Sequence, residues 1–264
     1  MIRSALMTVM TSAAIKAGRG LKRDFGEVGE LQVSMKGPGD FVSLADNRAE
    51  KSLYADLAKA RPGYGFVMEE SGRVEGSDKS HTWHIDPLDA TTNFLHAIPE
   101  FAVSIALERD RQIVAGVVYN PANDDMFLAE RGQGAFGRNR RLRVAARSEL
   151  SQALFGCGVP HLGKMAQHPR FLAELAAVME QVVNVRRMGC ASLDLAYVAA
   201  GRFDAFWERG LNSWDIAAGA LLVREAGGFV TGADGEANYL ETGSICCGNE
   251  AMHRELLELL RGVG

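Results

Sequence analysis

The chain has 264 residues, of which 47% are hydrophobic and 23% charged, a composition typical of a globular protein with a large core. Its formal net charge of -4 gives no overall electrostatic attraction to nucleic acid or to an anionic membrane. No apolar stretch approaches the ~18 residues of a membrane span. The four cysteines lack metal-binding or CxxC spacing, and we expect reduced, mostly buried thiols, which favours a cytoplasmic protein.

The N-terminal half predicts helices and strands in a mixed order. Apolar residues at helical spacing predict an amphipathic helix up to residue 17, in preference to a short signal peptide, followed by a Gly-rich connection over 18–29. A strand over 31–35 leads into a turn over 36–40, and the S-x-x-D pattern at Ser43 predicts a capped helix to about Ala60. We expect further strands, the last four forming a meander, at 64–68, 82–86, 101–108, 112–119 and 124–129.

The C-terminal half alternates between the two kinds of element. Expected strands lie at 153–157, 183–188, 203–207 and 244–247. Expected helices lie at 168–181, 191–200, 214–226 and 249–261. The chain therefore predicts an α+β part over about 1–150 and an α/β part over about 151–264, packed as one compact unit.

The segment from Trp83 to Asn93 is the first candidate for chemistry. A short apolar strand ends in Asp86 and Asp89, which are separated by Pro87 and Leu88. Because proline fixes φ, both carboxylates can be presented from one bend. Carboxylates beside free backbone amides suit a metal-bridged phosphate, although the motif taken alone is better explained as an Asp-Pro turn with Asp89 as a helix N-cap.

Two further acidic elements also have ordinary explanations when each is taken alone. Glu69 and Glu70 follow a strand-like run, as solvated loop acids often do. Asp215 opens an apolar helix, where the helix dipole favours an acid.

Together the three elements resemble the inositol monophosphatase family. Its members carry a GEE-type element, a W-x-[IV]-DP-[IL]-D-G-T-x-N-[FY] element and a W-D-x-A-[AG] element. This chain has Met68-Glu69-Glu70-Ser71, Trp83 to Phe94 and Trp214 to Gly219 in the same order, and a segment from Arg186 to Ala196 similar to the family's R-R-x-G-[ST]-A-A-x-[DN]. The resemblance spans nearly the whole chain and implies a layered αβαβα sandwich, of the inositol monophosphatase and fructose-1,6-bisphosphatase type.

The resemblance implies a magnesium centre built from oxygen ligands. Glu69, Asp86 and the backbone carbonyl of Leu88 would bind one Mg²⁺, and Asp86, Asp89 and Asp215 would bind a second. Ligation by oxygen alone suits Mg²⁺ and argues against zinc. A weaker third metal is expected near Lys36 and Asp46, which match a further family segment, so we expect two or three Mg²⁺ per subunit.

The resemblance also assigns roles in catalysis and substrate binding. Thr91 would help to orient the attacking water, with Glu70 beside it, and Glu69 and Asp89 would act with them through the metals. The amides of Ala90 and Thr91 would hold the phosphate. The polyol would contact Gly189, Ala191, Glu208 and Asp215.

The sequence departs from the family pattern at several positions. Ala90 and Met68 replace glycines of the two motifs, and Ala97 replaces a further common glycine. If position 90 has a positive φ, alanine there is strained by roughly 1 kcal/mol. Ser213 stands where the family commonly has Pro or Cys, and Cys190 stands where it commonly has Ser or Thr.

The leading hypothesis is a Mg²⁺-dependent, Li⁺-sensitive phosphatase for inositol 1-phosphate, expected to be a homodimer. Rival substrates are histidinol phosphate, a sugar bisphosphate and 3′-phosphoadenosine 5′-phosphate. A rival of another class is a regulatory protein that binds the transcription machinery. The basic cluster from Arg138 to Arg143, expected on a hairpin, is either a solvated turn or a docking patch for an acidic partner or RNA.

Overall fold

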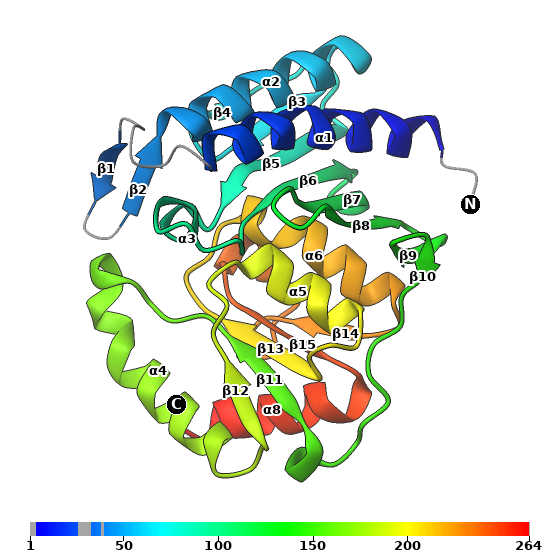
Figure 1. The fold of residues 1–264 in the computed structure, drawn as a ribbon. Coiled ribbons are helices and arrows are strands. Elements are labelled where there is room, and N and C mark those ends of the chain that lie inside the picture. The colour runs from blue at the N-terminus through cyan, green and yellow to red at the C-terminus, as the bar shows by residue number, and fades with distance from the viewer. Residues whose placement is uncertain (1–3, 26–32, 38–39, 264) are drawn as a thin grey trace.

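The protein is represented by a computed structural model that describes residues 4–25, 33–37 and 40–263, of which 33–37 and 40–42 are described by their backbone alone. Five layers follow one another in Figure 1: two helices, a large sheet, two helices, a smaller sheet and two helices. The expected αβαβα sandwich is confirmed. In the described part of the chain, no helix combines the length and apolarity that crossing a membrane requires.

The first layer consists of α1 (Ala5–Phe25) and α2 (Leu44–Ala60). The predicted end of the first helix at residue 17 is wrong, because α1 continues through Gly18 and Gly20. Gly18 lies against the sheet, where an added Cβ would stand 2.6 Å from Tyr119 Cε1. Close packing, rather than a turn, therefore explains this glycine. The predicted cap of α2 is confirmed, since Asp46 Oδ2 accepts a 2.8 Å hydrogen bond from the Ser43 amide.

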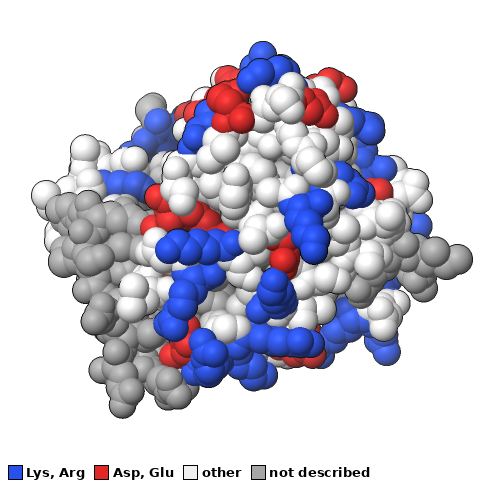
Figure 2. Space-filling view, turned by 90° about the horizontal axis from the view of Figure 1, so that it is seen from above, with Lys and Arg blue, Asp and Glu red and all other residues white. Residues whose placement is uncertain are grey.

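The outer surface of this helical layer carries both signs of charge. Figure 2 shows basic and acidic side chains intermixed on the face seen from above. Lys16 pairs with Asp56 at 2.8 Å across α1 and α2, and Arg48 pairs with Asp24 at 3.0 Å. A face with interspersed charges does not form the basic stripe that nucleic-acid binding requires.

The first sheet has the strand order β10-β9-β8-β7-β6-β5-β3-β4. Its strands are β3 (Gly65–Met68), β4 (Gly72–Val74), β5 (His81–Asp89), β6 (Ala102–Arg109), β7 (Gln112–Asn120), β8 (Asp125–Glu130), β9 (Gly134–Gly137) and β10 (Arg140–Arg141). The predicted meander is confirmed as β5 to β8, and the expected basic hairpin as β9 and β10. The exposed strand β4 was not predicted. A separate hairpin joins β1 (Val33–Gly37) to β2 (Asp40–Ser43), and residues 38–39 of the predicted turn lie outside the described residues.

The second sheet has the order β12-β11-β13-β15-β14, and three of its strands are parallel neighbours. The strands are β11 (Leu154–Cys157), β12 (Asn184–Arg186), β13 (Ala205–Glu208), β14 (Phe229–Thr231) and β15 (Ile245–Gly248). Its outer face is covered by α4 (His168–Met179), which follows the 3₁₀ segment η3 (Leu162–Gln167), and by α8 (Glu250–Gly262). The other short elements are η2 (Leu150–Gln152), α3 (Thr91–Leu95) and α7 (Tyr239–Thr242). Strand β14 and helix α7 are too short to have been predicted.

The central helices α5 (Ala191–Ala199) and α6 (Ser213–Glu225) lie between the two sheets and are buried on almost all sides. Their small residues allow close contact. A Cβ on Gly219 would stand 2.5 Å from Leu195 Cβ, and one on Gly116 of β7 would stand 3.0 Å from Ala218 Cα. The resulting dense packing fixes where both helices begin. Those beginnings form one wall of the site described next.

All four cysteines are buried and free of disulfides, as predicted.

Candidate active site

A bulge at the end of β5 presents two aspartates. In the pairing of β5 with β6, Asp86 lies opposite Ser104 and Asp89 opposite Ala102, so the β5 segment holds one extra residue. Pro87 lies in this bulge, where its missing N–H breaks no ladder hydrogen bond. The amide of Leu88 donates a 2.9 Å hydrogen bond to Asp86 Oδ1. The strand therefore continues to Asp89, three residues beyond the predicted end at Asp86.

The turn after β3 brings a third acid to the same place. β3 is parallel to β5, and the amide of Glu69 donates to the carbonyl of Ile85 at 3.2 Å. The side chains of Glu69 and Asp86 are hydrogen-bonded to each other. The structure thus brings together Glu69 and Asp86, which lie on different strands and were predicted as ligands of the same metal.

Buried Glu50 of α2 fixes this turn, a residue that the sequence analysis missed. Its carboxylate accepts hydrogen bonds from the amide of Glu70 at 2.8 Å and from the hydroxyl of Ser71 at 2.5 Å. Glu50 follows Asp46 by four residues, so both acids lie on one face of α2. In the sequence, Asp46 and Glu50 stand at helical spacing in the same stripe as Ala49 and Leu53. Acids within such an apolar stripe, which the structure shows to be buried, were the signal that could have identified Glu50.

Helix α6 contributes Asp215 from its first turn. Asp215 Oδ2 accepts a 2.7 Å hydrogen bond from the amide of Asn212, so the acid caps the helix as well as facing the site. The helix start is held against the first sheet by two further bonds, from Ser213 Oγ to His84 Nδ1 at 2.9 Å and from Ser104 Oγ to the carbonyl of Trp214 at 3.1 Å. These contacts bring Asp215 close to acids located 126 to 146 residues earlier in the chain.

The start of helix α5 holds Asp89. Asp89 Oδ2 accepts hydrogen bonds from the amide of Ser192 at 2.8 Å, from its hydroxyl at 2.6 Å and from Cys190 Sγ at 3.2 Å. Negative charge is favourable at a helix N-terminus. Neither Ser192 nor Cys190 was predicted as a partner of Asp89, because nothing local in the sequence links them to it.

Burial and neighbouring acids raise the pKa values of Asp86 and Asp215, and burial raises the pKa of Asp89. Burial, followed by the charges of Glu69, Asp89 and Asp215, raises the pKa of Asp86 well above its usual range. Burial and the charge of Asp89 raise the pKa of Asp215 to about 8. Buried like charges at such short range require a compensating cation or bound protons.

The donor set fits magnesium. It consists of carboxylate oxygens with the carbonyl of Leu88 nearby, and hard oxygen donors are what Mg²⁺ prefers. In the described residues, no three His, Cys, Asp or Glu side chains already stand as a group that could hold a metal ion. The hydrogen bond between the carboxyl groups of Glu69 and Asp86 requires a shared proton, and a bound cation would replace that proton.

Thr91 connects this cluster to α2. Its hydroxyl lies 3.0 Å from Asp46 Oδ1 and 3.2 Å from the carbonyl oxygen of Leu88. Asp46, predicted in a third-metal region, thus contacts Thr91, and burial raises its pKa. The side chain of Lys36, the other residue of that region, lies outside the described residues.

Ala90 has φ 75° and ψ 49°, the left-handed conformation that alanine rarely adopts. The alternative of a negative φ at this position is therefore excluded. Ala97 also has a positive φ, of 56°. Glycine would adopt these angles without a Cβ clash, whereas each alanine stores backbone strain of roughly 1 kcal/mol. Met68, in contrast, is buried in β3 as a core residue.

The residues predicted to bind the polyol lie at the second-sheet side of the cluster. Gly189 has φ 81° and packs against the guanidinium of Arg187, and Ala191 begins α5. Glu208 ends β13, and its carboxyl group lies directly against Gly158. Burial and the charges of Asp215 and Asp89 raise the pKa of Glu208 to about 8, so Glu208 belongs to the same electrostatic cluster.

Four acids brought together from both halves of a layered αβαβα sandwich are typical of a phosphate-processing hydrolase, and comparison with known proteins identifies the family. The family model described as "Inositol monophosphatase family" matches residues 3–264. An "Inositol-1-monophosphatase" of Mesorhizobium japonicum is 62% identical over 99% of this chain and 98% of its own length. A "Nus factor SuhB" of Escherichia coli is 40% identical over 97% of this chain and 96% of its own.

The fold comparison agrees with the sequence comparison. The crystal structure of "extragenic suppressor protein suhB" from Bartonella henselae has a TM-score of 0.95 and 55% identity, covering 98% of this chain and 99% of that one. The chain therefore belongs to the inositol monophosphatase family. It is a phosphoric monoester hydrolase, as the resemblance implied.

Proposed function

We propose that the protein hydrolyses inositol 1-phosphate to inositol and phosphate in a Mg²⁺-dependent, Li⁺-sensitive reaction. The observation that carries the proposal is the cluster of Glu69, Asp89 and Asp215 around the buried Asp86, whose neighbouring carboxylate charges need a cation. Two or three Mg²⁺ held there would make hydroxide available near neutral pH and stabilise the leaving alkoxide of an in-line displacement.

The residues of the chain have distinct tasks in this proposal. Thr91 donates its hydroxyl proton toward Asp46 and the carbonyl of Leu88, so its oxygen can accept a hydrogen bond from the attacking water. The amides of Ala90 and Thr91 hold the phosphate oxygens, and Glu70 supports the water from the turn fixed by Glu50. Glu208, with Gly189 and Ala191, accepts the hydroxyl groups of the polyol.

The first experiment is an Asp86→Asn substitution. Asparagine keeps an oxygen for the Leu88 amide and can donate to Glu69, so the fold should persist. We expect phosphate release to fall at least about 100-fold, and Mg²⁺ to lose its stabilisation of the fold against heat. Asp110→Asn, at an exposed turn position after β6, is the control and should behave as the wild type. Full activity of Asp86→Asn, or activity that survives excess EDTA, would contradict the metal site.

The second experiment ranks substrates. Phosphate release with Mg²⁺ is measured over inositol 1-phosphate, histidinol phosphate, fructose 1,6-bisphosphate and 3′-phosphoadenosine 5′-phosphate. Inositol 1-phosphate should give the highest kcat/KM. A higher value for one of the other three esters would assign the chain to that ester instead.

A regulatory role in transcription is a weaker candidate. Relatives named "Nus factor SuhB" are 40–42% identical to this chain, whereas those named "Inositol-1-monophosphatase" are 58–62% identical. Within the basic cluster, Arg138 is already paired with Asp125. Replacing Arg140, Arg141 and Arg143 by glutamine should leave turnover unchanged and would weaken partner binding only if this role exists.

We further propose a cytoplasmic homodimer. Support comes from large apolar side chains on and beside α4 that are 60–63% exposed, namely Leu162, Met165, Leu172, Met179 and Val183. Such a cluster is typical of a protein interface. Sedimentation of the wild type and of a Leu172→Glu, Met179→Glu double variant tests this, with a dimer expected for the first and a monomer for the second.

A further inference from the structure

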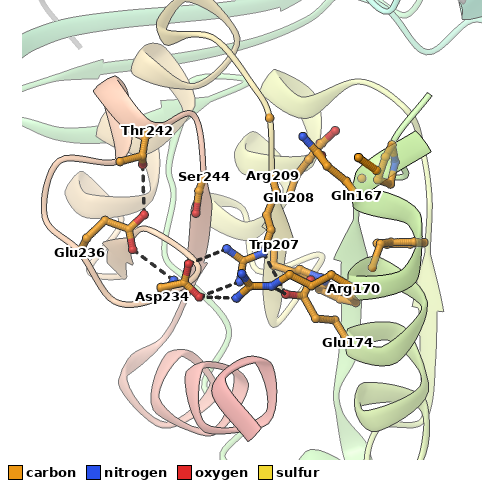
Figure 3. Close-up of a pocket in the computed structure, with 15 residues that line it drawn as sticks. Gln167, Arg170, Glu174, Trp207, Glu208, Arg209, Asp234, Glu236, Thr242 and Ser244 are labelled. Carbon is orange, nitrogen blue, oxygen red and sulfur yellow. Dashed lines mark hydrogen bonds and ion pairs between the residues drawn. The ribbon is translucent and has the colours of Figure 1, made fainter. Parts of the chain in front are cut away.

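A cavity of about 590 Å³ opens beside Glu208, on the side of β13 away from the helices α5 and α6 (Figure 3). It lies between the segment after β11, the start of α4, the end of β13 and the segment before β15. Its size is typical of a small-molecule pocket. None of the metal or phosphate residues predicted from the sequence lines it, and of the predicted polyol residues only Glu208 does.

The charges of the cavity are unequal. Four acids line it, Glu174, Glu208, Asp234 and Glu236, against the two basic residues Arg170 and Arg209. Glu174, Asp234 and Glu236 exceed the two arginines by one negative charge, and Glu208, whose pKa burial raises to about 8, adds a second only when it is ionised.

Both guanidinium groups already form ion pairs with acids of the cavity. Arg209 donates to Glu174 Oε1 at 2.8 Å and to both oxygens of Asp234 at 2.8 and 2.9 Å. Arg170 donates to the same two acids at 3.1 and 2.6 Å, and Figure 3 shows this network in the cavity. Because both arginines already pair with acids of the cavity, a second phosphate or carboxylate of a ligand would meet the surplus of negative charge.

Neutral polar groups remain for a ligand. Gln167 Oε1 is buried, and in the described residues it accepts no hydrogen bond. The Gln167 amide packs against Gly210, where an added Cβ would stand 3.0 Å from Gln167 Nε2. Gln167 therefore belongs to the wall of the cavity, and Thr242 and Ser244, which also line it, carry the hydroxyl groups that a hydroxylated ligand can contact.

Glu208 links this cavity to the catalytic cluster. Its carboxyl lies against Gly158, which also lines the cavity, and it interacts electrostatically with Asp215 and Asp89. On the basis of the proposed function, we infer that the cavity is a subsite for the distal part of the substrate's alcohol group. It receives a neutral hydroxylated or a cationic substituent in preference to a second anionic group.

Two nearby cations define the competing outcome. Lys164 donates a hydrogen bond to the carbonyl of Gly210, and the charges of Lys164 and Arg187 both lower the pKa of Glu208. If these cations decided the preference, an anionic substituent would be the favoured one. The charge of the substituent therefore separates the two possibilities.

The charge test compares three hexose esters with Mg²⁺: glucosamine 6-phosphate, glucose 6-phosphate and 6-phosphogluconate. We expect kcat/KM to fall in that order, with about a tenfold difference between the first and the last. Glu236→Gln keeps an acceptor for the Thr242 hydroxyl but removes one charge, so the difference should shrink several-fold. Glu258→Gln, at an exposed position of α8, is the matched control and should leave it unchanged. Equal rates, or a preference for 6-phosphogluconate, would overturn the inference.

The steric test uses Ala166→Trp, at an exposed position of η3 that lines the cavity. The indole should raise KM for glucosamine 6-phosphate about tenfold and leave glycerol 2-phosphate within about twofold, since the smaller ester does not reach the cavity. Ala55→Trp, exposed on α2, is the control. An unchanged KM for the hexosamine ester, or an equal loss on both esters, contradicts a selective subsite.

These results separate the inference from the proposed function. Wild-type protein that hydrolyses none of the esters with Mg²⁺ contradicts the proposed phosphatase activity. If the wild type hydrolyses the esters but neither Glu236→Gln nor Ala166→Trp alters its preference among them, the result contradicts the subsite and leaves the proposed function intact.

Discussion

The hydroxyl of Thr91 donates a 3.0 Å hydrogen bond to the buried carboxylate of Asp46, although 45 residues separate them. The other oxygen of Asp46 accepts from Ser43, which caps α2. The carboxylate of Asp46 therefore caps the N-terminus of α2 and also orients the Thr91 hydroxyl beside the carbonyl of Leu88. The position of that hydroxyl depends on the first helical layer, which contributes no predicted ligand of the two principal metals.

The first prediction concerns Thr91→Val, which removes this hydroxyl while keeping the shape of the side chain. We expect kcat to fall about 100-fold, because the attacking water loses the group that orients it. Unfolding free energy should fall by about 1–2 kcal/mol, since Asp46 loses a partner. Steady-state kinetics and urea unfolding measure the two effects. Thr91→Ser keeps the hydroxyl and should retain most activity; a valine variant with wild-type kcat would remove Thr91 from the mechanism.

The second prediction concerns the partners of Asp89. Ser192→Ala removes the 2.6 Å hydrogen bond to Asp89 Oδ2 but leaves the one from the Ser192 amide. We expect the Mg²⁺ concentration for half-maximal activity to rise about tenfold, because outer partners orient metal ligands. Cys190→Ser replaces a weak thiol donor by a hydroxyl and should not raise it. A metal titration that is identical in Ser192→Ala and wild type would refute the link between α5 and the metal site.

The third prediction concerns the strained backbone at Ala90. Ala90→Gly should raise the unfolding free energy by about 1 kcal/mol, since glycine adopts a φ of 75° without the Cβ clash. Ala97→Gly should act in the same direction. Ala196→Gly, inside α5, should instead destabilise the protein by at least about 1 kcal/mol. Urea unfolding decides between these outcomes, and a destabilised Ala90→Gly would show that the methyl group contributes more than the strain removes.

The fourth prediction concerns the dependence of stability on pH. Burial, and then the charge of Arg261, lower the pKa of His253 below its ordinary value of 6.5. Between that lowered pKa and 6.5 the unfolded chain binds more protons at His253 than the folded one. The contribution of this residue to stability is therefore present above pH 6.5 and is lost as the pH falls through the folded-state pKa.

His253→Gln should reduce this loss while keeping a polar partner for Thr231 Oγ1, which lies 3.0 Å from His253 Nε2. Urea unfolding of both proteins between pH 8 and 5 checks the prediction. The difference in unfolding free energy between wild type and variant should be constant above about pH 7 and should change in favour of the variant below 6.5. A constant difference over the whole range would exclude His253 as the titrating group.

Most of the architecture could be predicted from local patterns. The helices α2, α4, α5, α6 and α8 and the strands of the meander follow from apolar periodicity and capping residues. Prediction failed where contacts between distant segments override local preference. Helix α1 passes through Gly18 because Tyr119 packs there, and β14 is a strand because it pairs with β15.

The sequence by itself predicted which acids would carry the chemistry, because Glu69, Asp86, Asp89 and Asp215 stand in motifs of fixed order and carboxylates are ligands that Mg²⁺ prefers. Tertiary structure alone decided how these acids are held and what adjoins them. Glu50 holds the amide of Glu70 from 20 residues away, and Ser192 holds Asp89 from 103 residues away. The cavity beside Glu208 is likewise lined by segments that are distant in the sequence. Such contacts depend on how the layers pack against one another, and packing in three dimensions leaves no local pattern in the sequence.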